Sequence, residues 1–417
     1  MKRSFLAVIT AAVLSLSLVG CAGGTQPSNT PTGPVTLVFW SGFTGGDADT
    51  YKQAIAEFNS THPNIQIDYQ LQPWDTIAQK LPAAIASGSG PDIATPDYNV
   101  ATVLQYAGNG LALPITNVVG DGDGQVPASV IPKAILNGFT VDGKLYAVPA
   151  SFTTLMLYYN KKLLSAAGLT PPTTMKELQD DAVKLTANGV YGISLADNNT
   201  IGMWPTLIWS DGGDIVNAQG CSALSDQTTI DSVQAWASLI VNSKISPVGQ
   251  SGQDADNLFA ASKAAFEING PNAAGEYTPA GIDFGVVAVP TGASGTPVTL
   301  ASTVPMIISA QSKHPAEAQE FLAWWMGKDA QRIISVGAAG GPARSDMADD
   351  PALQANPLVQ SFSAQVPYSR LLLPDQKDFA QINQDIFQPA IQAATRDGDA
   401  ATHLKDASAQ LNTLLGC

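Results

Sequence analysis

The chain of 417 residues carries 20 Lys and Arg against 35 Asp and Glu, a formal net charge of −15 at pH 7. Its length exceeds what one hydrophobic core usually organises, so two lobes are expected, and a hydrophobic content of 45% can fill large cores. The acidic balance argues against nucleic acid as a partner, because phosphate binding requires a basic surface.

Residues 1–20 have the pattern of an export signal. Two cations precede an apolar run over residues 5–19, and a small residue then precedes Cys21. The run is too short for a stable membrane span, which needs about 20 apolar residues. Residues 18–21, Leu-Val-Gly-Cys, resemble the lipobox of bacterial lipoproteins, which implies cleavage before Cys21 and a lipid on its sulfur. An ordinary cleaved signal with an incidental cysteine is the alternative.

Residues 21–34 follow as a polar linker. They carry no charge and are rich in Gly, Pro, Ser and Thr, so they cannot bury a core and are predicted to form a disordered tether. Fully extended, the tether would lift a folded domain roughly 45 Å from a membrane. We therefore expect a lipid-anchored protein on the outer face of the bacterial cytoplasmic membrane.

Two further cysteines, Cys221 and Cys417, could form a disulfide in an oxidising compartment. The sequence leaves this open, because it does not show whether the two lie within bonding distance. Neither lies beside a second cysteine or a histidine at the spacing of metal ligands, so no metal site is predicted.

The folded part begins with alternating strands and helices. In chain order the pattern predicts a strand over 35–40, a helix that includes 51–58, a strand over 65–69, a helix over 74–86 and a strand over 92–95. This βαβαβ order is typical of an open parallel sheet, which binds ligands at the carboxyl ends of its strands. The loops over 40–47 and 96–99 both lie at those ends.

Residues 138–145 match the spacing of a phosphate-binding loop, but Leu145 stands where that loop needs a Ser or Thr to reach magnesium. A β-hairpin fits better. Asp142-Gly143 is a favoured two-residue turn, and residues 139–141 and 144–148 would be its arms.

The order of several motifs resembles the extracellular solute-binding proteins of ABC sugar importers, over essentially all of residues 35–417. These motifs are the strand ending in Trp40, Gly-Pro-Asp-Ile at 90–93, Tyr-Ala-Val-Pro at 146–149, Leu-Tyr-Tyr-Asn-Lys at 157–161, Asp-Gly-Gly at 211–213, Ile-Asn-Gly-Pro at 268–271 and Phe-Gly-Val at 284–286 before Pro290. The later motifs follow the order of the maltodextrin-binding branch.

The resemblance implies two α/β lobes, each with a central mixed sheet, joined by crossing segments near 149–151, 303–306 and 349–352, with sugar held in the cleft between the lobes. The expected lobe 1 is 35–150 with 306–350. The expected lobe 2 is 151–305 with the C-terminal helices of 351–417.

A sugar site needs flat aromatic surfaces for the C–H faces of the ring and planar polar groups for its hydroxyls. The candidate aromatics are Trp40, Trp74, Tyr98, Trp204, Trp209 and Tyr277, although each alone fits a packing role equally well. The candidate polar residues are Ser41, Thr44, Asp47, Asp97, Asn99, Asn199, Asn269, Asn272 and Arg344. The tryptophans in helical patterns, Trp236, Trp324 and Trp325, are expected in the core.

Three of these candidates carry a qualification. Trp204-Pro205 matches a Trp-Pro that packs near the sugar in the maltodextrin-binding branch, which implies a supporting role. Arg344 fits a structural salt bridge almost as well as a ligand contact. Asn272 stands where that branch has a sugar-stacking tryptophan, which weakens the case for a long glucan.

Catalysis has little support in the sequence. The three histidines are isolated, and neither H-E-x-x-H nor G-x-S-x-G occurs. The resemblance instead implies a protein without catalytic residues or cofactor that captures a mono- or oligosaccharide and delivers it to permease subunits by lobe closure, and we expect it to be a monomer. The alternatives are a non-sugar polar solute in the same fold and a glycoside hydrolase, for which two facing carboxylates would suffice.

Overall fold

A computed structural model describes residues 34–44, 47–97, 99–198 and 202–417. The expected signal peptide, the tether and the lipidation site Cys21 lie outside the described residues. The candidate residues Tyr98 and Asn199 also lie outside them. No helix in the described ranges is long and apolar enough to cross a membrane.

The chain opens with the predicted βαβαβ unit. Its elements are β1 (Val35–Ser41), α1 (Ala48–Thr61), β2 (Ile65–Leu71), α2 (Trp74–Ser87) and β3 (Ile93–Ala94). Both β2 and β3 pair with β1 in parallel. The carboxyl ends of these strands therefore meet at one edge, as the sequence predicts.

Two long antiparallel strands extend this sheet, β6 (Ala147–Thr154) and β11 (Thr299–Ile308). The sheet has the order β12-β11-β3-β1-β2, with β6 on the side of β11, and β12 is the short strand Ser369–Leu371. The predicted hairpin precedes β6 as β4 (Thr140–Val141) and β5 (Lys144–Leu145). Its turn residues Asp142 and Gly143 have φ of 49° and 73°, which is why Gly is favoured there.

A second sheet has the order β10-β7-β9-β8, formed by β7 (Met156–Asn160), β8 (Tyr191–Ser194), β9 (Ala264–Asn269) and β10 (Phe284–Val287). Strand β8 runs parallel to β9, whereas the other pairs are antiparallel. Each half of the molecule thus contains a mixed sheet, which confirms the predicted fold class.

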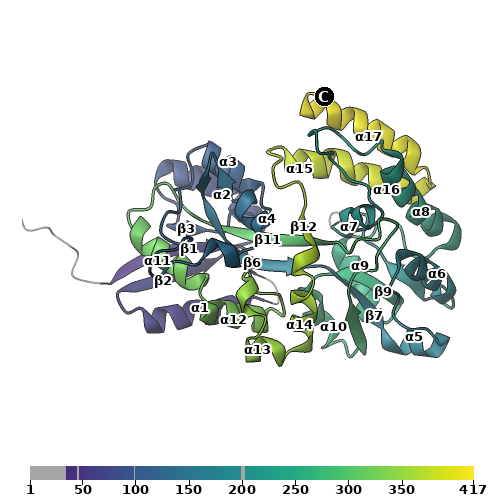
Figure 1. Ribbon diagram of the computed structural model, residues 1–417, viewed down its shortest axis with the longest axis horizontal. Coiled ribbons are helices and arrows are strands. Elements are labelled where there is room, and N and C mark those ends of the chain that lie inside the picture. Colours follow the sequence, from purple (N-terminus) through teal and green to yellow (C-terminus); the bar gives the residue numbers. More distant parts are fainter. Residues whose placement is uncertain (1–33, 45–46, 98, 199–201) are drawn as a thin grey trace, which may run out of the picture.

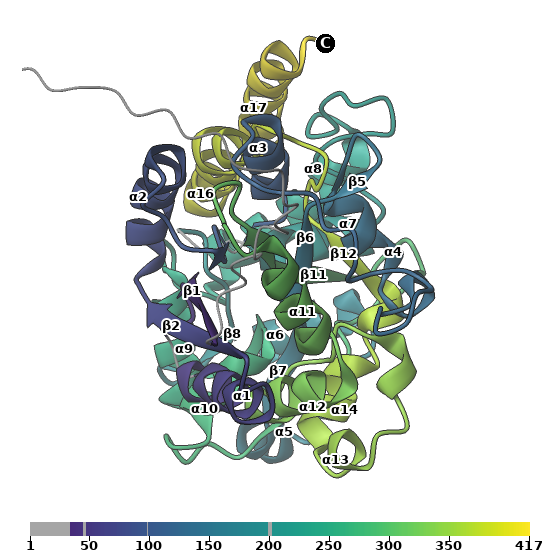
Figure 2. The ribbon, with the colours of Figure 1, turned by 90° about the vertical axis from the view of Figure 1, so that its left-hand side faces the viewer.

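Helices cover both sheets, and Figures 1 and 2 show them as two layered bodies joined by β6 and β11. The remaining α-helices are α3 (Thr102–Gly108), α4 (Lys133–Gly138), α5 (Lys161–Ala167), α6 (Met175–Leu185), α7 (Met203–Ser210), α8 (Gln227–Ser243), α9 (Gly252–Ala260), α10 (Ala274–Tyr277), α11 (Pro315–Trp325), α12 (Lys328–Gly337), α13 (Pro351–Gln354), α14 (Pro357–Ser363), α15 (Phe379–Gln381), α16 (Gln388–Asp397) and α17 (Ala400–Leu415). A π-helical stretch, Ile382–Phe387, joins α15 to α16.

Each sheet has its own hydrophobic core. In the first, Phe39 contacts Tyr69, Phe321 and Trp325 with ring centroids 5.2 to 6.4 Å apart. The second core includes the fully buried Trp236 and receives α16 and α17 from the end of the chain. The expected core placement of the helical tryptophans is confirmed, with Trp324 half-buried against the first core.

The ribbon of β6 and β11 has an irregularity at its centre. Pro305 pairs with Pro149, and the register shifts between Val304 and Pro305. The extra residue, Ala150, offers its carbonyl oxygen to the indole Nε1 of Trp325 at 3.2 Å. A side chain of α11 therefore holds the bulged backbone to the first core.

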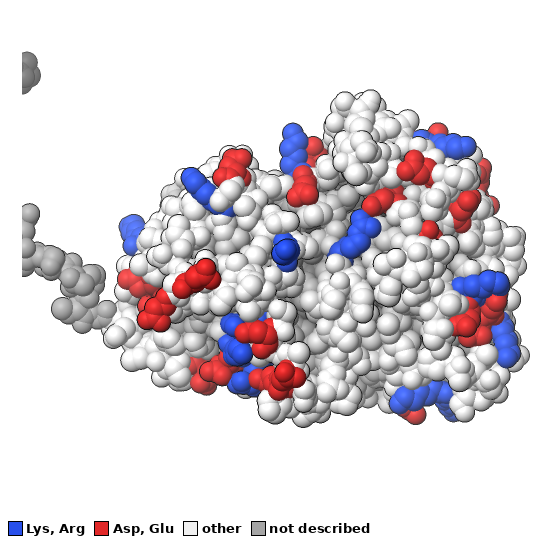
Figure 3. All heavy atoms as spheres, viewed as in Figure 1, with Lys and Arg blue, Asp and Glu red and all other residues white. Residues whose placement is uncertain are grey.

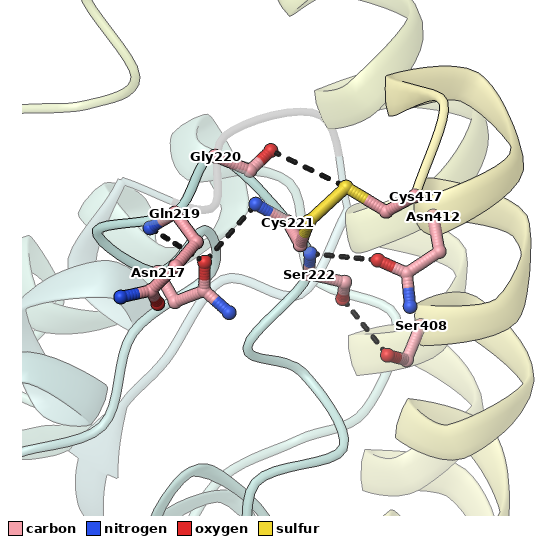
Figure 4. Close-up of a disulfide and its surroundings, with 8 residues drawn as sticks. All are labelled: Asn217, Gln219, Gly220, Cys221, Ser222, Ser408, Asn412 and Cys417. Atoms are coloured by element: carbon pink, nitrogen blue, oxygen red, sulfur yellow. Dashed lines mark hydrogen bonds between the residues drawn. A yellow bond between two sulfur atoms is a disulfide. The ribbon is translucent and has the colours of Figure 1, made fainter.

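A disulfide joins Cys221 and Cys417, a pair that the sequence leaves open (Figure 4). Beside it, Ser222 N donates to Asn412 Oδ1 at 2.8 Å, and Ser408 Oγ donates to Ser222 Oγ at 2.9 Å. Covalent and hydrogen bonds together fasten α17 to the segment before α8.

Charged side chains on the face shown in Figure 3 are scattered, with Lys and Arg mostly beside Asp and Glu. No continuous basic patch is seen on that face. This face therefore offers no extended basic surface to which a polyanion could bind.

Candidate ligand-binding cleft

A cavity of about 390 Å³ lies between elements of the two sheets, beside the crossing strand β6. The elements around it, α1, α10 and α12, lie along the same lower edge in both ribbon views (Figures 1 and 2). The lining residues are Asp47, Tyr51, Gln331, Ile334, Ser335 and Gly337–Gly341 from the side of the first sheet, Pro271, Asn272, Gly275 and Glu276 from the side of the second, and Ser151, Phe152 and Thr153 from β6.

Asp47 occupies the position before α1, where an acidic side chain usually caps the helix. Within the described residues its side chain makes no capping hydrogen bond, and it lines the cavity instead. Its burial raises the pKa of the Asp47 carboxyl. Because the side chain is not used as a cap, its oxygens can accept hydrogen bonds from a ligand.

Tyr51 follows one helical turn after Asp47 and is only 1% exposed. Burial, and then the charge of Asp47, raise the pKa of the Tyr51 phenol well above its usual value. The side chain of Ser151 on β6 interacts with the phenol and opposes this rise. The start of α1 and the crossing strand thus meet at the cavity wall.

Ser335 lies on α12 and is also 1% exposed. Its hydroxyl lines the cavity and has no hydrogen-bond partner among the residues that the structure describes. Its neighbour Gln331 is fully engaged, since Oε1 accepts from Ala343 N at 2.8 Å and Nε2 donates to Trp325 O at 3.0 Å. Buried hydroxyls are normally satisfied, so Ser335 is a candidate ligand contact.

A buried acidic cluster lies behind the opposite wall. The Tyr277 hydroxyl donates to Glu267, and Asn269 Nδ2 donates to Asp256 Oδ1 at 2.6 Å. Burial, and then the charge of Asp256, raise the pKa of Glu267 well above its usual value. Gly270 follows Asn269 in the chain, and its carbonyl oxygen accepts a hydrogen bond from the Tyr158 hydroxyl at 2.8 Å.

This cluster fixes the end of β9, from which the chain enters the cavity wall. The peptide N–H of Gly270 donates to Asn269 Oδ1 at 2.7 Å. Pro271 and Asn272 follow directly and line the cavity. Asn272 is exposed, so its amide can both donate to a ligand and accept from it.

Of the residues predicted to bind sugar, Asp47 and Asn272 thus line this cavity. The remaining first-loop candidates lie nearby but are engaged differently. Ser41 is fully buried and accepts a hydrogen bond from the Tyr69 hydroxyl at 3.0 Å. Trp40 is half-buried and donates from Nε1 to Gln70 Oε1 at 3.0 Å, whereas Thr44 is exposed.

Trp204, Tyr277 and Asn269 are also candidates from the sequence, Trp204 beside a helical turn and with a supporting role implied by the resemblance, and none of the three lines this cavity. Trp204 lies in α7, is fully buried, and donates from Nε1 to Ala196 O at 2.9 Å. Tyr277 is fully buried in α10, and Asn269 belongs to the acidic cluster. Short helices bury the two aromatic side chains, whereas Asn269 is the last residue of β9.

Two more candidates are held in structural contacts. Trp209 is 5% exposed, lies 4.3 Å beneath the Arg370 guanidinium, and donates to Asp214 Oδ1 at 2.9 Å. Arg344 makes two 2.8 Å hydrogen bonds to Asp346, as the salt-bridge alternative expects. Arg344 lines a different cavity, of about 320 Å³.

The loop after β3 contributes the half-buried Asp97 and Asn99. Asn99 Oδ1 accepts a hydrogen bond from Ala101 N at 3.0 Å, an Asx turn that shapes the start of α3. Trp74, at the start of α2, is half-buried against the first core. The 390 Å³ cavity is lined by none of these three residues.

The sequence did not single out Tyr51, Glu276 or Ser335 as site residues. Tyr51 and Ser335 both fall inside helical patterns, where the apolar periodicity points to core. An acidic residue one turn before Tyr51 was the available signal. For Ser335 no comparable signal exists, because a serine within a helix is common and its partners depend on packing.

Two layered bodies, two crossing strands and a cavity lined from both bodies define a two-lobed ligand-binding protein. Residues 44–332 match the family described as bacterial extracellular solute-binding protein. The match spans more than half of the chain, and the protein belongs to this family.

Relatives cover most of the chain. A maltotriose-binding protein of Pyrococcus abyssi is 23% identical over 432 residues, covering 89% of this chain and 90% of the relative. An arabinooligosaccharide-binding protein of Halalkalibacterium halodurans is 24% identical over 389 residues, covering 86% and 82%. The crystal structure of the GacH receptor of Streptomyces glaucescens, solved unliganded and with acarbose, superposes with a TM-score of 0.79 at 22% identity, covering 92% of this chain and 99% of the receptor.

Proposed function

We propose that the protein captures a sugar or short oligosaccharide in the cleft between its lobes and delivers it to permease subunits of an ABC transporter, without chemistry. The observation that carries the proposal is the cavity of about 390 Å³ lined from both sheets. Small-molecule sites usually occupy about 300–1,000 Å³, and this cavity lies near the lower limit. A small sugar suits it better than a long glucan.

The cavity offers the groups that sugar hydroxyls require. Asp47 supplies a carboxylate acceptor, Asn272 an amide donor and acceptor, and Ser335 a hydroxyl without a partner in the described protein. Phe152 and Pro271 add apolar surface for the C–H faces of a ring. The relatives named for maltotriose and arabinooligosaccharide support a carbohydrate ligand.

Lobe closure would complete the site, because the polar groups come from opposite sides. A ligand that contacts Asp47 and Asn272 together favours the conformation in which the two walls are close. The crossing strands β6 and β11 would carry the bending, and the closed form would be recognised by the permease. The lobe boundaries expected from the sequence stay a prediction, as do the monomeric state and the lipid on Cys21.

The direct test is calorimetric titration of residues 22–417, since all core residues of the described structure lie at Leu37 or beyond. Mono- to hexasaccharides would be titrated beside polyols and amino acids. We expect saturable sugar binding without turnover. Consumption of the sugar would indicate a hydrolase, and binding of only another solute would retain the fold and reject the sugar.

A matched pair of variants locates the site. Asn272→Ala should weaken sugar binding by about 0.5–1.5 kcal/mol, the value of one hydrogen bond. Asn64→Ala, at an exposed position before β2, should leave it unchanged. If both variants bind sugar with the same affinity, the sugar site lies outside this cavity.

The anchor has its own test. In the lipid-anchored form, replacing Cys21 removes the sulfur that would carry the lipid. A labelled fatty acid should therefore be incorporated into the wild type and not into Cys21→Ala. Equal labelling of the two proteins would contradict lipidation at this residue.

A further inference from the structure

The charges around the cavity are of one sign. Asp47 lies on one wall and Glu276 on the other, and no lysine, arginine or histidine is among the lining residues that the structure describes. The residues of the folded region left undescribed, 45–46, 98 and 199–201, include no cationic residue in the sequence. The cavity therefore has no cation to balance its two carboxylates.

The nearest cations of the same elements are committed to other acids. On α1, Lys52 pairs with Asp49 at 2.9 Å. On α12, Arg332 pairs with Asp329 at 2.7 Å and with Asp350 at 2.8 Å. These surface pairs leave the charge of Asp47 uncompensated, which agrees with the upward shift of its pKa by burial.

The opposite wall is backed by further acids. Gln253 Nε2 donates to Glu276 Oε2 at 3.1 Å, which orients that carboxylate without neutralising it. The charge of Glu276 contributes to raising the pKa of Asp256, so the wall is coupled to the buried cluster of Asp256 and Glu267. The two acids add a negative potential to the space between the walls, strongest near the half-buried Asp47, because Glu276 is exposed to water.

Ser335 provides an independent sign of a ligand in this space. Its buried hydroxyl lines the cavity without a partner in the described protein. A hydroxyl can accept a hydrogen bond, as both carboxylates can. An ammonium group has three donors and no acceptor, so it would satisfy acceptors on both walls at once.

We propose that this cleft selects sugars bearing a protonated amine over neutral sugars and excludes acidic sugars. The inference rests on the proposed function, because it assumes a carbohydrate ligand. A buried ammonium is tolerated only when it is paired, and Asp47 and Glu276 supply the pairing. A carboxylate or phosphate on the ligand would meet like charge on both walls.

The test compares closely related sugars of different charge. Glucosamine, N-acetylglucosamine, glucose and glucuronic acid, with the corresponding β-1,4-linked disaccharides, would be titrated into residues 22–417 at pH 6 and low salt. We expect the amine to bind at least tenfold more tightly than its acetylated and neutral counterparts. Glucuronic acid should show no measurable binding.

Variants tie the preference to the two walls. Asp47→Asn and Glu276→Gln should each reduce the ratio of amine to neutral affinity at least threefold. Glu57→Gln removes an exposed acid near the other end of α1, and it should retain the full ratio. A ratio unchanged in the first two variants would overturn the assignment of the walls.

The outcomes separate this inference from the proposed function. Neutral sugars that bind as tightly as the amine, or an acidic sugar that binds most tightly, would overturn the charge selection and leave sugar capture standing. Failure of every sugar in the panel would overturn both.

Discussion

The indole ring of Trp74 lies directly against the backbone of Gly42 and leaves no space for a Cβ at that position. Phe43 meets the same indole edge-on at 5.7 Å and stacks on Tyr51 at 3.8 Å. Tyr51 lines the ligand cavity. An aromatic series therefore runs from the start of α2 through the first loop to the cavity wall, which gives Trp74 a packing role there.

Gly42→Ala should displace the Trp74 ring and disturb this series. We expect a loss of about 1–3 kcal/mol in the free energy of unfolding, as for overpacking of a filled site, together with weaker ligand binding. Urea denaturation gives the first quantity and calorimetry the second. Gly108→Ala, where an added Cβ meets no atom within 4 Å, is the control and should cause neither loss.

Asp47→Asn should change stability and binding in opposite directions. Burial raises the folded-state pKa of Asp47 above 3.8, so the folded protein loses stability as pH rises from 3.8 through that pKa. The amide has no such loss, and the variant should melt at a higher temperature than the wild type at pH 7, with the difference vanishing below pH 3.8.

The same change should weaken ligand binding, because it removes a charged acceptor. The expected loss is about 1.5–3 kcal/mol, the range for a hydrogen bond to a charged group. Calorimetry and thermal melts on the same preparation give both values. A variant that binds as well as the wild type would take Asp47 out of the site.

Glu267→Gln tests the buried cluster. Because burial raises the pKa of Glu267 well above 4.5, the folded state keeps a proton that the unfolded state releases, and stability falls as pH rises above 4.5. For one proton the slope is at most about 1.4 kcal/mol per pH unit. The glutamine variant should show a flatter profile and greater stability at neutral pH.

Melting temperatures measured from pH 4 to pH 9 would reveal this difference. Glu57→Gln, at an exposed position on α1, should keep the wild-type profile. Identical profiles for the wild type and Glu267→Gln would show that the cluster exchanges no extra proton on unfolding.

Loss of the cross-link between Cys221 and Cys417 should destabilise the protein. The two residues are 196 positions apart, so the bond constrains a long stretch of the unfolded chain, and removal of such a bond typically costs about 2–4 kcal/mol. The double variant Cys221→Ser with Cys417→Ser should unfold at lower urea. Reductant should destabilise the wild type to the same level and leave the variant unaffected.

Much of the fold could be predicted because its signals are local. The apolar strand that becomes β1, the alternation in β2 and the Asp142-Gly143 turn each specify their structure within a few residues. The parallel direction of β1, β2 and β3 also follows, because successive strands joined by helices run in the same direction. Their order does not follow, since β3 pairs with β1 and not with β2, the strand before it in the chain.

The site could be predicted only in part, because it depends on contacts between distant segments. Asp47 and Asn272 could be found because each follows the end of a strand in a polar loop. Trp204 could not be placed, since whether its short helix is buried depends on which elements pack around it. The bond between Cys221 and Cys417 depends on the docking of α17, which no local pattern encodes.

The rung at which Pro149 meets Pro305 has a mechanical consequence. Neither residue has an N–H, so neither strand can supply a backbone donor at this pair. Trp325 clamps the adjacent Ala150 carbonyl to the first core, so we expect flexing to begin just beyond that point. Because the crossing strands are held on the side of the first core and lack backbone donors at the Pro149–Pro305 pair, we expect them to bend in one direction. The lobe of the first sheet would stay fixed while the lobe of the second sheet moves.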